Sequence, residues 1–366
     1  MKSNISGVRV TSVVSVVPSI VHRFEDDMKN FPFSESSSLK LAKVMGFREH
    51  RIADKDTTLI DLAVYGADYL FKKGIISKEA LSAVIFVAQN HEYPVPGNSK
   101  IFHSKLSLPK NVHCVDMYEN CTGFVSGLYT AACMLASSDD IKNIMLVTSS
   151  SGACYANKTD RNTYPLVGDA AGIVIVSKTE NKDDSIYFEF CHDTDQCNTL
   201  IVPAGGLRCP CSEETAKMET DEMGNTRSKN QLHMDGTAVF HYVMEAMPPL
   251  LEDLCAYSDV SKENIDYFLT HQPNRFMLEK LADLLKVPRE KVFNNVVENF
   301  GNSSCATIPV AIALNMKDMI LSKQYKICFA AFGAGMSVGA AITDFGKLNC
   351  CALIEHPCSG SNEYKE

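Results

Sequence analysis

The sequence predicts an α/β protein, and the alternation of two kinds of segment is the first observation behind that prediction. Short apolar runs rich in β-branched or aromatic residues are typical of buried strands, and they occur at 82–88, 143–149, 172–177, 266–270 and 326–331. Helical patterns occur at 57–73, 124–136, 237–257, 275–286 and 307–322. Strands that alternate with helices indicate an α/β fold.

The second observation is the length of 366 residues, which is long for one core and predicts two fused halves. Each half contains a strand, a loop with reactive residues, an apolar helix and another strand. The charged stretch KTENKDDS marks the join, so we expect an N-terminal half at 1–180 and a C-terminal half at 181–346. Residues 347–366 show no clear period and are expected to form a peripheral tail. Residues 8–21 are expected to form a buried strand and its turn, and the polar residues 209–232 a surface excursion.

Composition excludes several classes of protein. The net charge is −9, so a nucleic-acid partner is not expected. No apolar run approaches the roughly eighteen residues of a membrane helix, so no membrane association is expected. The fourteen cysteines are irregularly spaced and lack the paired spacing of structural zinc sites, which favours free thiols in a reduced, cytoplasmic protein without a metal.

The stretch DMYENCTGFVSGLYTAACML places Cys121 at the first position of an apolar run. Residues 124–136 are apolar on almost every side, which is typical of a helix buried inside a domain. At a helix N-terminus, the unpaired amides and the macrodipole favour a thiolate and can help to bind an oxyanion. Position therefore predicts Cys121 as a nucleophile, whereas most cysteines in such a run are structural.

Two other polar residues are candidate partners for this thiol. His271 directly follows the predicted strand in FLTHQPN, and Asn302 lies in a Gly-Asn-Ser-Ser turn before an apolar helix. Taken singly, a strand-end histidine and a turn or N-cap asparagine explain these positions equally well.

Nine short motifs follow one another along nearly the whole chain. They are GFREHRIA (46–53), NCTGF (120–124), TDR (159–161), VGDAAG (167–172), PAGG (203–206), MDGTAVF (234–240), HQPN (271–274), FGNSSCATIP (300–309) and FGAGMSVGAA (332–341). In this order they resemble the β-ketoacyl-acyl carrier protein synthase III family of the thiolase superfamily.

The resemblance implies a thiolase-like five-layered αβαβα sandwich of two similar halves, usually a homodimer. It implies a catalytic triad of Cys121, His271 and Asn302 and an oxyanion hole formed by the backbone amides of Cys121 and Ala334. The implied substrate is an acyl thioester of coenzyme A or of a carrier protein, with acyl carrier protein as a partner and no cofactor.

The implied chemistry has two half-reactions. The thiolate of Cys121 attacks an acyl thioester and retains the acyl group. A malonyl thioester then loses carbon dioxide, and the resulting enolate receives hydrogen bonds from His271 and Asn302 before it attacks the acyl-cysteine.

The expected substrate-binding residues include one departure from the family pattern. Family members commonly hold the adenine of coenzyme A between a tryptophan and an arginine; this chain has no tryptophan, and Lys40 takes that place, whereas Arg161 matches the arginine. The hypothesis is therefore a longer acyl chain or a carrier-protein donor in place of acetyl-CoA. Asn274, Arg275 and Gly236 are the other candidate substrate-binding residues, and Arg275 is equally well explained as an exposed helix charge.

Two alternative functions stay open. One is acyl transfer to an oxygen or nitrogen acceptor without condensation, which needs chiefly a base. The other is an inactive partner subunit of a two-protein synthase. Both are disfavoured because His271 and Asn302 are both present, and an enolate needs both donors.

Overall fold

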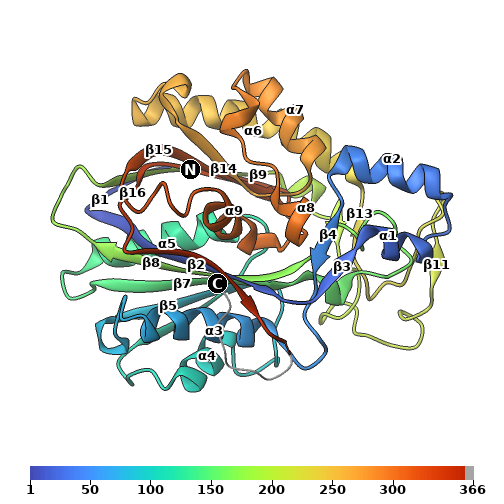
Figure 1. The fold of residues 1–366 in the computed structure, drawn as a ribbon, viewed down its shortest axis with the longest axis horizontal. Coiled ribbons are helices and arrows are strands. Elements are labelled where there is room, and N and C mark those ends of the chain that lie inside the picture. Colours follow the sequence, from blue (N-terminus) through green and yellow to red (C-terminus); the bar gives the residue numbers. More distant parts are fainter. Residues whose placement is uncertain (359–366) are drawn as a thin grey trace.

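The computed structural model describes residues 1–358, and two sheets form its centre (Figure 1). The larger sheet has the strand order β17 (Cys350–His356), β2 (Val8–Pro18), β8 (Asp169–Lys178), β7 (Asn143–Ser151), β5 (Ala83–Ala88) and β6 (His113–Tyr118). The smaller sheet has the order β1 (Lys2–Ser6), β9 (Ser185–His192), β16 (Ser337–Gly346), β15 (Gln324–Gly333) and β14 (Tyr267–Thr270).

Helices form three further layers around these sheets (Figure 1). The middle layer, between the sheets, holds α5 (Gly123–Ser137) and α9 (Thr307–Asn315). The outer layers hold α3 (Leu59–Lys72) with α4 (Asn98–Leu106) on the larger sheet, and α6 (Gly236–Ser258) with α7 (Arg275–Leu285) on the smaller sheet. The five-layered αβαβα sandwich expected from the sequence is thus confirmed.

The helix α5 lacks a polar face because sheets cover it on both sides. Leu128, Ala131 and Leu135 are fully buried in a core to which both sheets contribute. A Cβ added at Gly127 would lie 2.6 Å from Leu146, so the glycine allows the helix to approach the sheet closely. Each fully buried leucine stabilises the fold by about 1.5–3 kcal/mol, and this packing fixes the helix whose start carries Cys121.

Smaller elements surround one end of the sandwich. They are α1 (Phe24–Asp27), α2 (Glu35–Met45), α8 (Val296–Phe300), and the strand pairs β3 (Val21–Arg23) with β4 (Glu49–Arg51), β10 (Leu200–Ile201) with β13 (His233–Met234), and β11 (Glu219–Thr220) with β12 (Thr226–Arg227). The hairpin β11–β12 lies within the predicted surface excursion.

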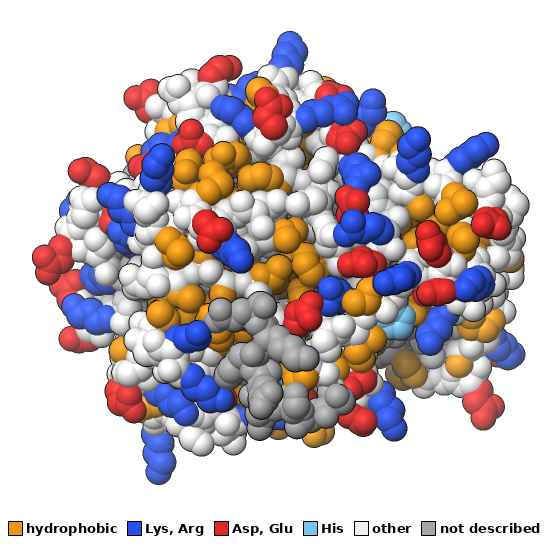
Figure 2. All heavy atoms as spheres, viewed as in Figure 1, with side chains coloured by type: hydrophobic (Ala, Val, Ile, Leu, Met, Phe, Trp, Pro, Cys, Tyr) orange, Lys and Arg blue, Asp and Glu red, His pale blue; other side chains and the backbone are white. Residues whose placement is uncertain are grey.

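The surface of the face in Figure 2 carries positive and negative side chains interspersed with apolar ones. No large field of one sign is visible on this face, which matches the modest net charge. Among residues 1–358, no helix is both long and apolar enough to cross a membrane.

The chain ends differ from the sequence expectation. Residues 347–366 were expected to form a peripheral tail, and within them β17 pairs in parallel with β2 at the edge of the larger sheet. The last residues of the predicted tail, 359–366, lie outside the described part of the chain. The N-terminal strand β1 likewise pairs with β9 in the smaller sheet, so each half receives a terminal strand from the other end of the chain.

One predicted helix is also shorter than expected. The apolar pattern at 307–322 predicts a continuous helix, but α9 ends at Asn315 and turns follow. The Asn315 side chain donates to the carbonyl oxygen of Ala311 and bonds to the side chain of Asn295. Asparagine side chains compete in this way with backbone hydrogen bonds, which favours a helix end here.

Candidate active site

Cys121 lies in the short connection between β6, which ends at Tyr118, and α5, which begins at Gly123. Part of its surface remains accessible. The end of β15 passes directly against it, because a Cβ added at Gly333 would lie 2.5 Å from Cys121 Cβ and 2.9 Å from its Sγ. The side-chain oxygen of Asn120 is buried near the same glycine and has no hydrogen-bond partner among the described residues. Cys121 is therefore crowded on the side of β15.

Burial raises the pKa of the Cys121 thiol to about 11. Hydrogen bonds from the Ser304 hydroxyl and from the backbone amides of Cys121 and Ala334 lower this pKa, and the charge of Glu119 raises it. The thiolate expected at the start of a helix is thus outweighed by the loss of hydration around the sulfur. The two amides predicted to bind an oxyanion nevertheless both act on Sγ of Cys121.

His271 follows the last residue of β14 and is buried. Its backbone amide donates to the carbonyl oxygen of Ala330 at 2.8 Å, and its Nδ1 lies 2.8 Å from Oγ1 of Thr307. The ring also packs edge-on against Phe332, with 5.6 Å between centroids. Burial lowers the pKa of His271 to about 3, so the imidazole is neutral at physiological pH.

Asn302 is held by backbone bonds on both sides. Its amide donates to the Leu166 carbonyl oxygen at 2.7 Å, and its carbonyl oxygen accepts from the Gly168 amide at 3.0 Å. A Cβ at Gly168 would lie only 2.1 Å from the Phe300 carbonyl oxygen. Any side chain at this position would therefore prevent the close backbone contact between the VGDAAG and FGNSSCATIP segments. Oδ1 of Asn302 accepts from the Ser304 amide at 2.8 Å, which fixes the orientation of the side-chain amide.

The turn that begins at Asn302 brings the three predicted catalytic residues together. Ser304 contacts Asn302 through its amide, and its Oγ lies 3.7 Å from Sγ of Cys121. Its carbonyl oxygen lies 2.8 Å from the Thr307 hydroxyl, which also contacts His271. Ser304 and Thr307 were not predicted as site residues, although both lie in FGNSSCATIP. Their residue types are common in turns, so only the contacts distinguish them.

A second layer of contacts supports the Asn302 turn. His50 places Nδ1 2.6 Å from the Val167 carbonyl oxygen and Nε2 2.8 Å from Oδ2 of Asp27. Val167 forms a parallel bridge with Asn302. Asp27, His50 and His22 form the one group within residues 1–358 whose side chains could hold a metal ion. The 2.8 Å separation of His50 Nε2 and Asp27 Oδ2 is that of a hydrogen bond, however, so these two side chains satisfy each other.

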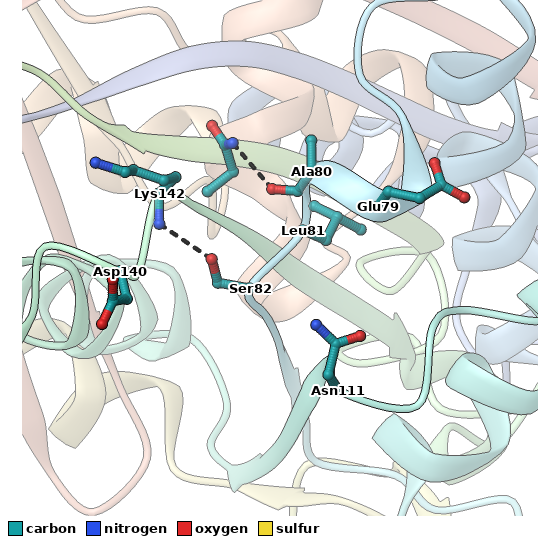
Figure 3. Close-up of a pocket in the computed structure, with 8 residues that line it drawn as sticks. Glu79, Ala80, Leu81, Ser82, Asn111, Asp140 and Lys142 are labelled. Atoms are coloured by element: carbon teal, nitrogen blue, oxygen red, sulfur yellow. Dashed lines mark hydrogen bonds between the residues drawn. The ribbon is translucent and has the colours of Figure 1, made fainter.

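A separate hollow of about 440 Å³ lies where β5 and β7 begin, whereas Cys121 follows the end of the parallel strand β6 (Figure 3). Its lining residues are Glu79, Ala80, Leu81, Ser82, Asn111, Asp140, Lys142 and Asn143. The Ser82 hydroxyl accepts from the Lys142 amide, and Asn143 donates to the Ala80 carbonyl oxygen. None of the predicted site residues lines this hollow.

Arg161 lies apart from the triad contacts, against an aromatic ring. Its guanidinium carbon lies 3.5 Å from the centroid of Phe33, and its NH1 donates to the Ser37 hydroxyl at 3.0 Å. The missing aromatic residue was predicted to be replaced by Lys40, and Phe33 was not predicted as a site residue because only the tertiary fold brings its ring to Arg161. Phe33 covers one face of the guanidinium, leaving no space for a base between the two groups.

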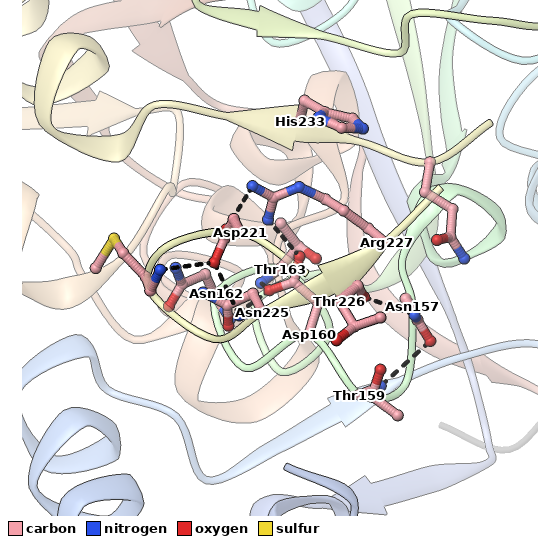
Figure 4. Close-up of polar contacts among 12 residues, drawn as sticks. Asn157, Thr159, Asp160, Asn162, Thr163, Asp221, Asn225, Thr226, Arg227 and His233 are labelled. Atoms are coloured by element: carbon pink, nitrogen blue, oxygen red, sulfur yellow. Dashed lines mark hydrogen bonds and ion pairs between the residues drawn. The ribbon is translucent and has the colours of Figure 1, made fainter. Parts of the chain in front are cut away.

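The loop that carries Arg161 is fixed by the hairpin β11–β12 (Figure 4). Arg227 forms ion pairs with Asp160 at 3.0 Å and with Asp221 at 2.8 Å. Asn157 donates to the Thr226 carbonyl oxygen at 2.7 Å. The Asp160 side chain is fully buried, so the surface excursion is a firm support for the TDR motif.

The other three candidate substrate-binding residues have structural partners. Asn274 caps α7 by accepting a hydrogen bond from the Met277 amide at 2.8 Å. Arg275 forms an ion pair with Glu298. Gly236 is the exposed first residue of α6, with no atom within 4 Å of a Cβ added there. No described contact joins these residues to the triad, and their binding roles stay predictions.

Known proteins provide an independent comparison. The family model 3-oxoacyl-[acyl-carrier-protein] synthase III matches residues 115–195, and the model of the C-terminal part of the same enzymes matches residues 255–345. The first range includes Cys121, and the second includes His271 and Asn302.

Similar sequences and structures extend over nearly the whole chain. A putative 3-oxoacyl-[acyl-carrier-protein] synthase 3 of Campylobacter jejuni is 26% identical over 95% of this chain and 97% of its own. The structure of a 3-oxoacyl-(acyl-carrier protein) synthase from Burkholderia xenovorans has 28% identity and a TM-score of 0.89, covering 97% of this chain and 99% of the other. The priming β-ketosynthase of the R1128 polyketide pathway, at 19% identity and a TM-score of 0.78, shares the fold over 93% of this chain and 97% of its own. The chain belongs to the β-ketoacyl-acyl carrier protein synthase III family of the thiolase superfamily, a family of acyltransferases.

Proposed function

We propose that this chain transfers an acyl group from a thioester to Cys121 and then condenses it with a malonyl thioester, with loss of carbon dioxide. The observation that supports this most is the turn at 302–304, whose contacts reach Cys121, Asn302 and, through Thr307, His271. The experiment that tests it is mass spectrometry of the enzyme incubated with acyl thioesters, with and without malonyl-carrier protein.

In the first half-reaction, the sulfur of Cys121 forms a bond to the acyl carbon and the donor thiol leaves. The thiol proton of Cys121 leaves with the departing thiol, so the exchange is balanced. The tetrahedral intermediate carries a negative oxygen, which the amides of Cys121 and Ala334 are proposed to bind. Both amides already act on the neighbouring sulfur, which supports this role.

In the second half-reaction, the malonyl carboxylate leaves as carbon dioxide, and its bonding electrons form an enolate. Since Oδ1 of Asn302 is bound by the Ser304 amide, its Nδ2 is the group available to donate to the enolate oxygen. Donation from Nε2 of His271 requires the ring proton on that nitrogen. In that tautomer Nδ1 accepts a hydrogen bond from the Thr307 hydroxyl at 2.8 Å, so this hydroxyl must turn from the Ser304 carbonyl oxygen, to which it donates in the structure, toward the ring.

The reaction products distinguish this proposal from the two alternatives, which are acyl transfer without condensation and an inactive subunit. A non-condensing enzyme would acylate Cys121 and release an ester or amide without carbon dioxide. An inactive subunit would not form the acyl-enzyme. The fixed orientation of Asn302 supports condensation, because an oriented carboxamide donor has no evident use in simple acyl transfer.

We further propose that acetyl-CoA is a poor donor compared with a longer acyl chain or a carrier-protein thioester. Phe33 covers a face of Arg161, and a base stacked on a side chain gains about 1–3 kcal/mol. We therefore expect a KM for acetyl-CoA about tenfold above that of the same acyl group on a carrier protein. Steady-state kinetics with both donors measures this ratio. Micromolar saturation and fast turnover with acetyl-CoA would contradict it, and Arg161→Ala is the control for a nucleotide contact.

We propose a homodimer formed through β6, which is the outermost strand of the larger sheet. Among the described residues its strand partner is β5 alone, so one edge of its backbone is free to pair. Apolar side chains stand on and beside this edge: Val115 and Met117 are partly buried, Tyr118 is 74% exposed, and the nearby Val95 is 84% exposed. A second copy of the same strand is complementary in both pairing and polarity.

Substitution of Met117 with glutamate is expected to weaken this dimer, because it places a charge in an apolar contact. Light scattering should give twice the mass of one chain for the unmodified protein and a shift toward the monomer, by at least about tenfold in the dissociation constant, for Met117→Glu. Leu321→Glu, at an exposed apolar position elsewhere, is the control. A monomeric unmodified protein at micromolar concentration would refute the dimer.

A further inference from the structure

Ser304 is the residue through which the contacts of the site meet. Its Oγ lies 3.7 Å from Sγ of Cys121, and among the hydrogen bonds of the described residues it is the side chain that reaches this sulfur. Its amide orients Asn302, and its carbonyl oxygen contacts the Thr307 hydroxyl. The buried Ser304 thus contacts Cys121, Asn302 and Thr307. Asn302 is one proposed donor to the enolate oxygen, and Thr307 contacts the other donor, His271.

The backbone of Ser304 has an unusual conformation that depends on its surroundings. Its φ is +52°, in the left-handed region that residues other than glycine rarely adopt. A glycine would occupy this position with less strain. The strained backbone directs the amide to Asn302 and places the hydroxyl at Cys121, so the serine side chain has a use that a glycine would not provide.

We propose that the Ser304 hydroxyl is a fourth catalytic group, which donates a hydrogen bond to the Cys121 sulfur as the thiolate forms and attacks. This inference rests on the proposed function, because the reaction that Ser304 would assist is acyl transfer to Cys121. The reactivity of the Cys121 sulfur, however, can be measured without that reaction. The hydroxyl keeps its own proton throughout. The thiol proton leaves with the departing thiol, so no other reactant is needed.

The burial of the site gives this hydrogen bond its importance. Burial strongly disfavours the charged sulfur, and the hydroxyl is the largest of the contributions that favour it. No acid–base side chain is hydrogen bonded to the sulfur among the described residues, and His271 is engaged with Thr307. Hydrogen bonds to charged groups are the stronger ones, so loss of this donor is expected to reduce the thiolate fraction about tenfold.

The test is the rate of alkylation of Cys121 by iodoacetamide, followed for the Cys121 peptide by mass spectrometry from pH 7 to pH 11. The variants are Ser304→Ala, which removes the hydroxyl alone, and Ser304→Gly, which also relieves the backbone strain. Both should react about tenfold more slowly than the unmodified protein at pH 8. Because the variants need a higher pH to form the thiolate, the tenfold ratio of the rates should begin to narrow only as the pH nears 11, where the unmodified thiol is about half ionised.

Ser303→Ala is the matched control, because the Ser303 hydroxyl is also buried but has no hydrogen-bond partner among the described residues. Its alkylation profile should equal that of the unmodified protein. The Cys154 sulfur is partly covered and accepts a hydrogen bond from Asn90, so faster alkylation of Cys154 in any variant would report loss of the fold. Unchanged profiles for both Ser304 variants would overturn the proposal. Slowing in Ser304→Gly alone would assign the effect to the backbone and also overturn it. Alkylation needs no acyl donor, so these outcomes do not depend on whether the chain condenses malonyl thioesters.

Discussion

Cys121→Ala is expected to abolish acyl-enzyme formation and to lower condensation by at least about 10⁴-fold, because removal of a nucleophile removes the covalent route as a whole. Ala lacks the atom that bonds to the acyl carbon, and no neighbouring group replaces it. Cys305 follows Ser304 in the chain, but its thiol is buried and contacts the Val87 and Ser149 carbonyl oxygens. Mass spectrometry of the intact protein after incubation with an acyl thioester measures the loss directly.

The control for this substitution is Cys154→Ala. Burial of the Cys154 sulfur raises the pKa of this thiol to about 12, so it is a weakly ionised thiol like Cys121 but lies outside the triad contacts. This variant should keep a single acyl adduct of the expected mass. An adduct of undiminished yield on Cys121→Ala would show that another group is the nucleophile and would remove the basis of the mechanism.

His271→Ala and Asn302→Ala are expected to separate the two half-reactions. Each side chain is proposed to donate one hydrogen bond to the enolate oxygen, and loss of one such donor costs about 2.7–4 kcal/mol, or about 10²–10³-fold in rate. Acylation of Cys121 should persist in both variants, since the oxyanion of that step is assigned to backbone amides. Single-turnover measurements of acylation and of carbon dioxide release determine the two rates separately.

The exposed His113 and Asn111 provide controls of the same residue types far from the triad contacts. Their alanine variants should retain both half-reactions. Full condensation by His271→Ala or by Asn302→Ala would exclude that residue from the mechanism. Because the pKa of His271 is lowered to about 3, its neutral form persists well below pH 6.5, and condensation should not decline there through protonation of this ring.

The local patterns of the sequence were sufficient to predict an α/β protein, whereas its five layers were implied by the resemblance to the family. The helix α5 is apolar on every side because it lies between two sheets. The strand β5 is buried on both faces because α5 covers one face of its sheet, and α3 and α4 cover the other. The edge strand β17 was missed. Its residues are mostly partly exposed and begin with two adjacent cysteines, so neither hydrophobicity nor an alternating pattern distinguished this strand from a tail.

The sequence offered candidate site residues through their motifs but could not give their electrostatics. Cys121, His271 and Asn302 lie in motifs, whereas Ser304 and Thr307 differ from ordinary turn residues only in what they contact after folding. The expected thiolate at Cys121 was overestimated, because a sequence indicates a helix start but does not give the burial of the sulfur. The aromatic partner of Arg161 was missed for the same kind of reason: Phe33 reaches it through the tertiary fold.

The central claim is that a carbon–carbon bond forms at Cys121, and a chase of the isolated acyl-enzyme tests it most directly. The enzyme would be loaded with an isotopically labelled acyl group, freed of donor, and mixed with malonyl-carrier protein. The account predicts that the label leaves Cys121 as a β-ketoacyl thioester on the carrier, with one carbon dioxide released for each label transferred. Label that leaves as free acid, ester or amide without carbon dioxide, or that stays on the protein, would contradict it.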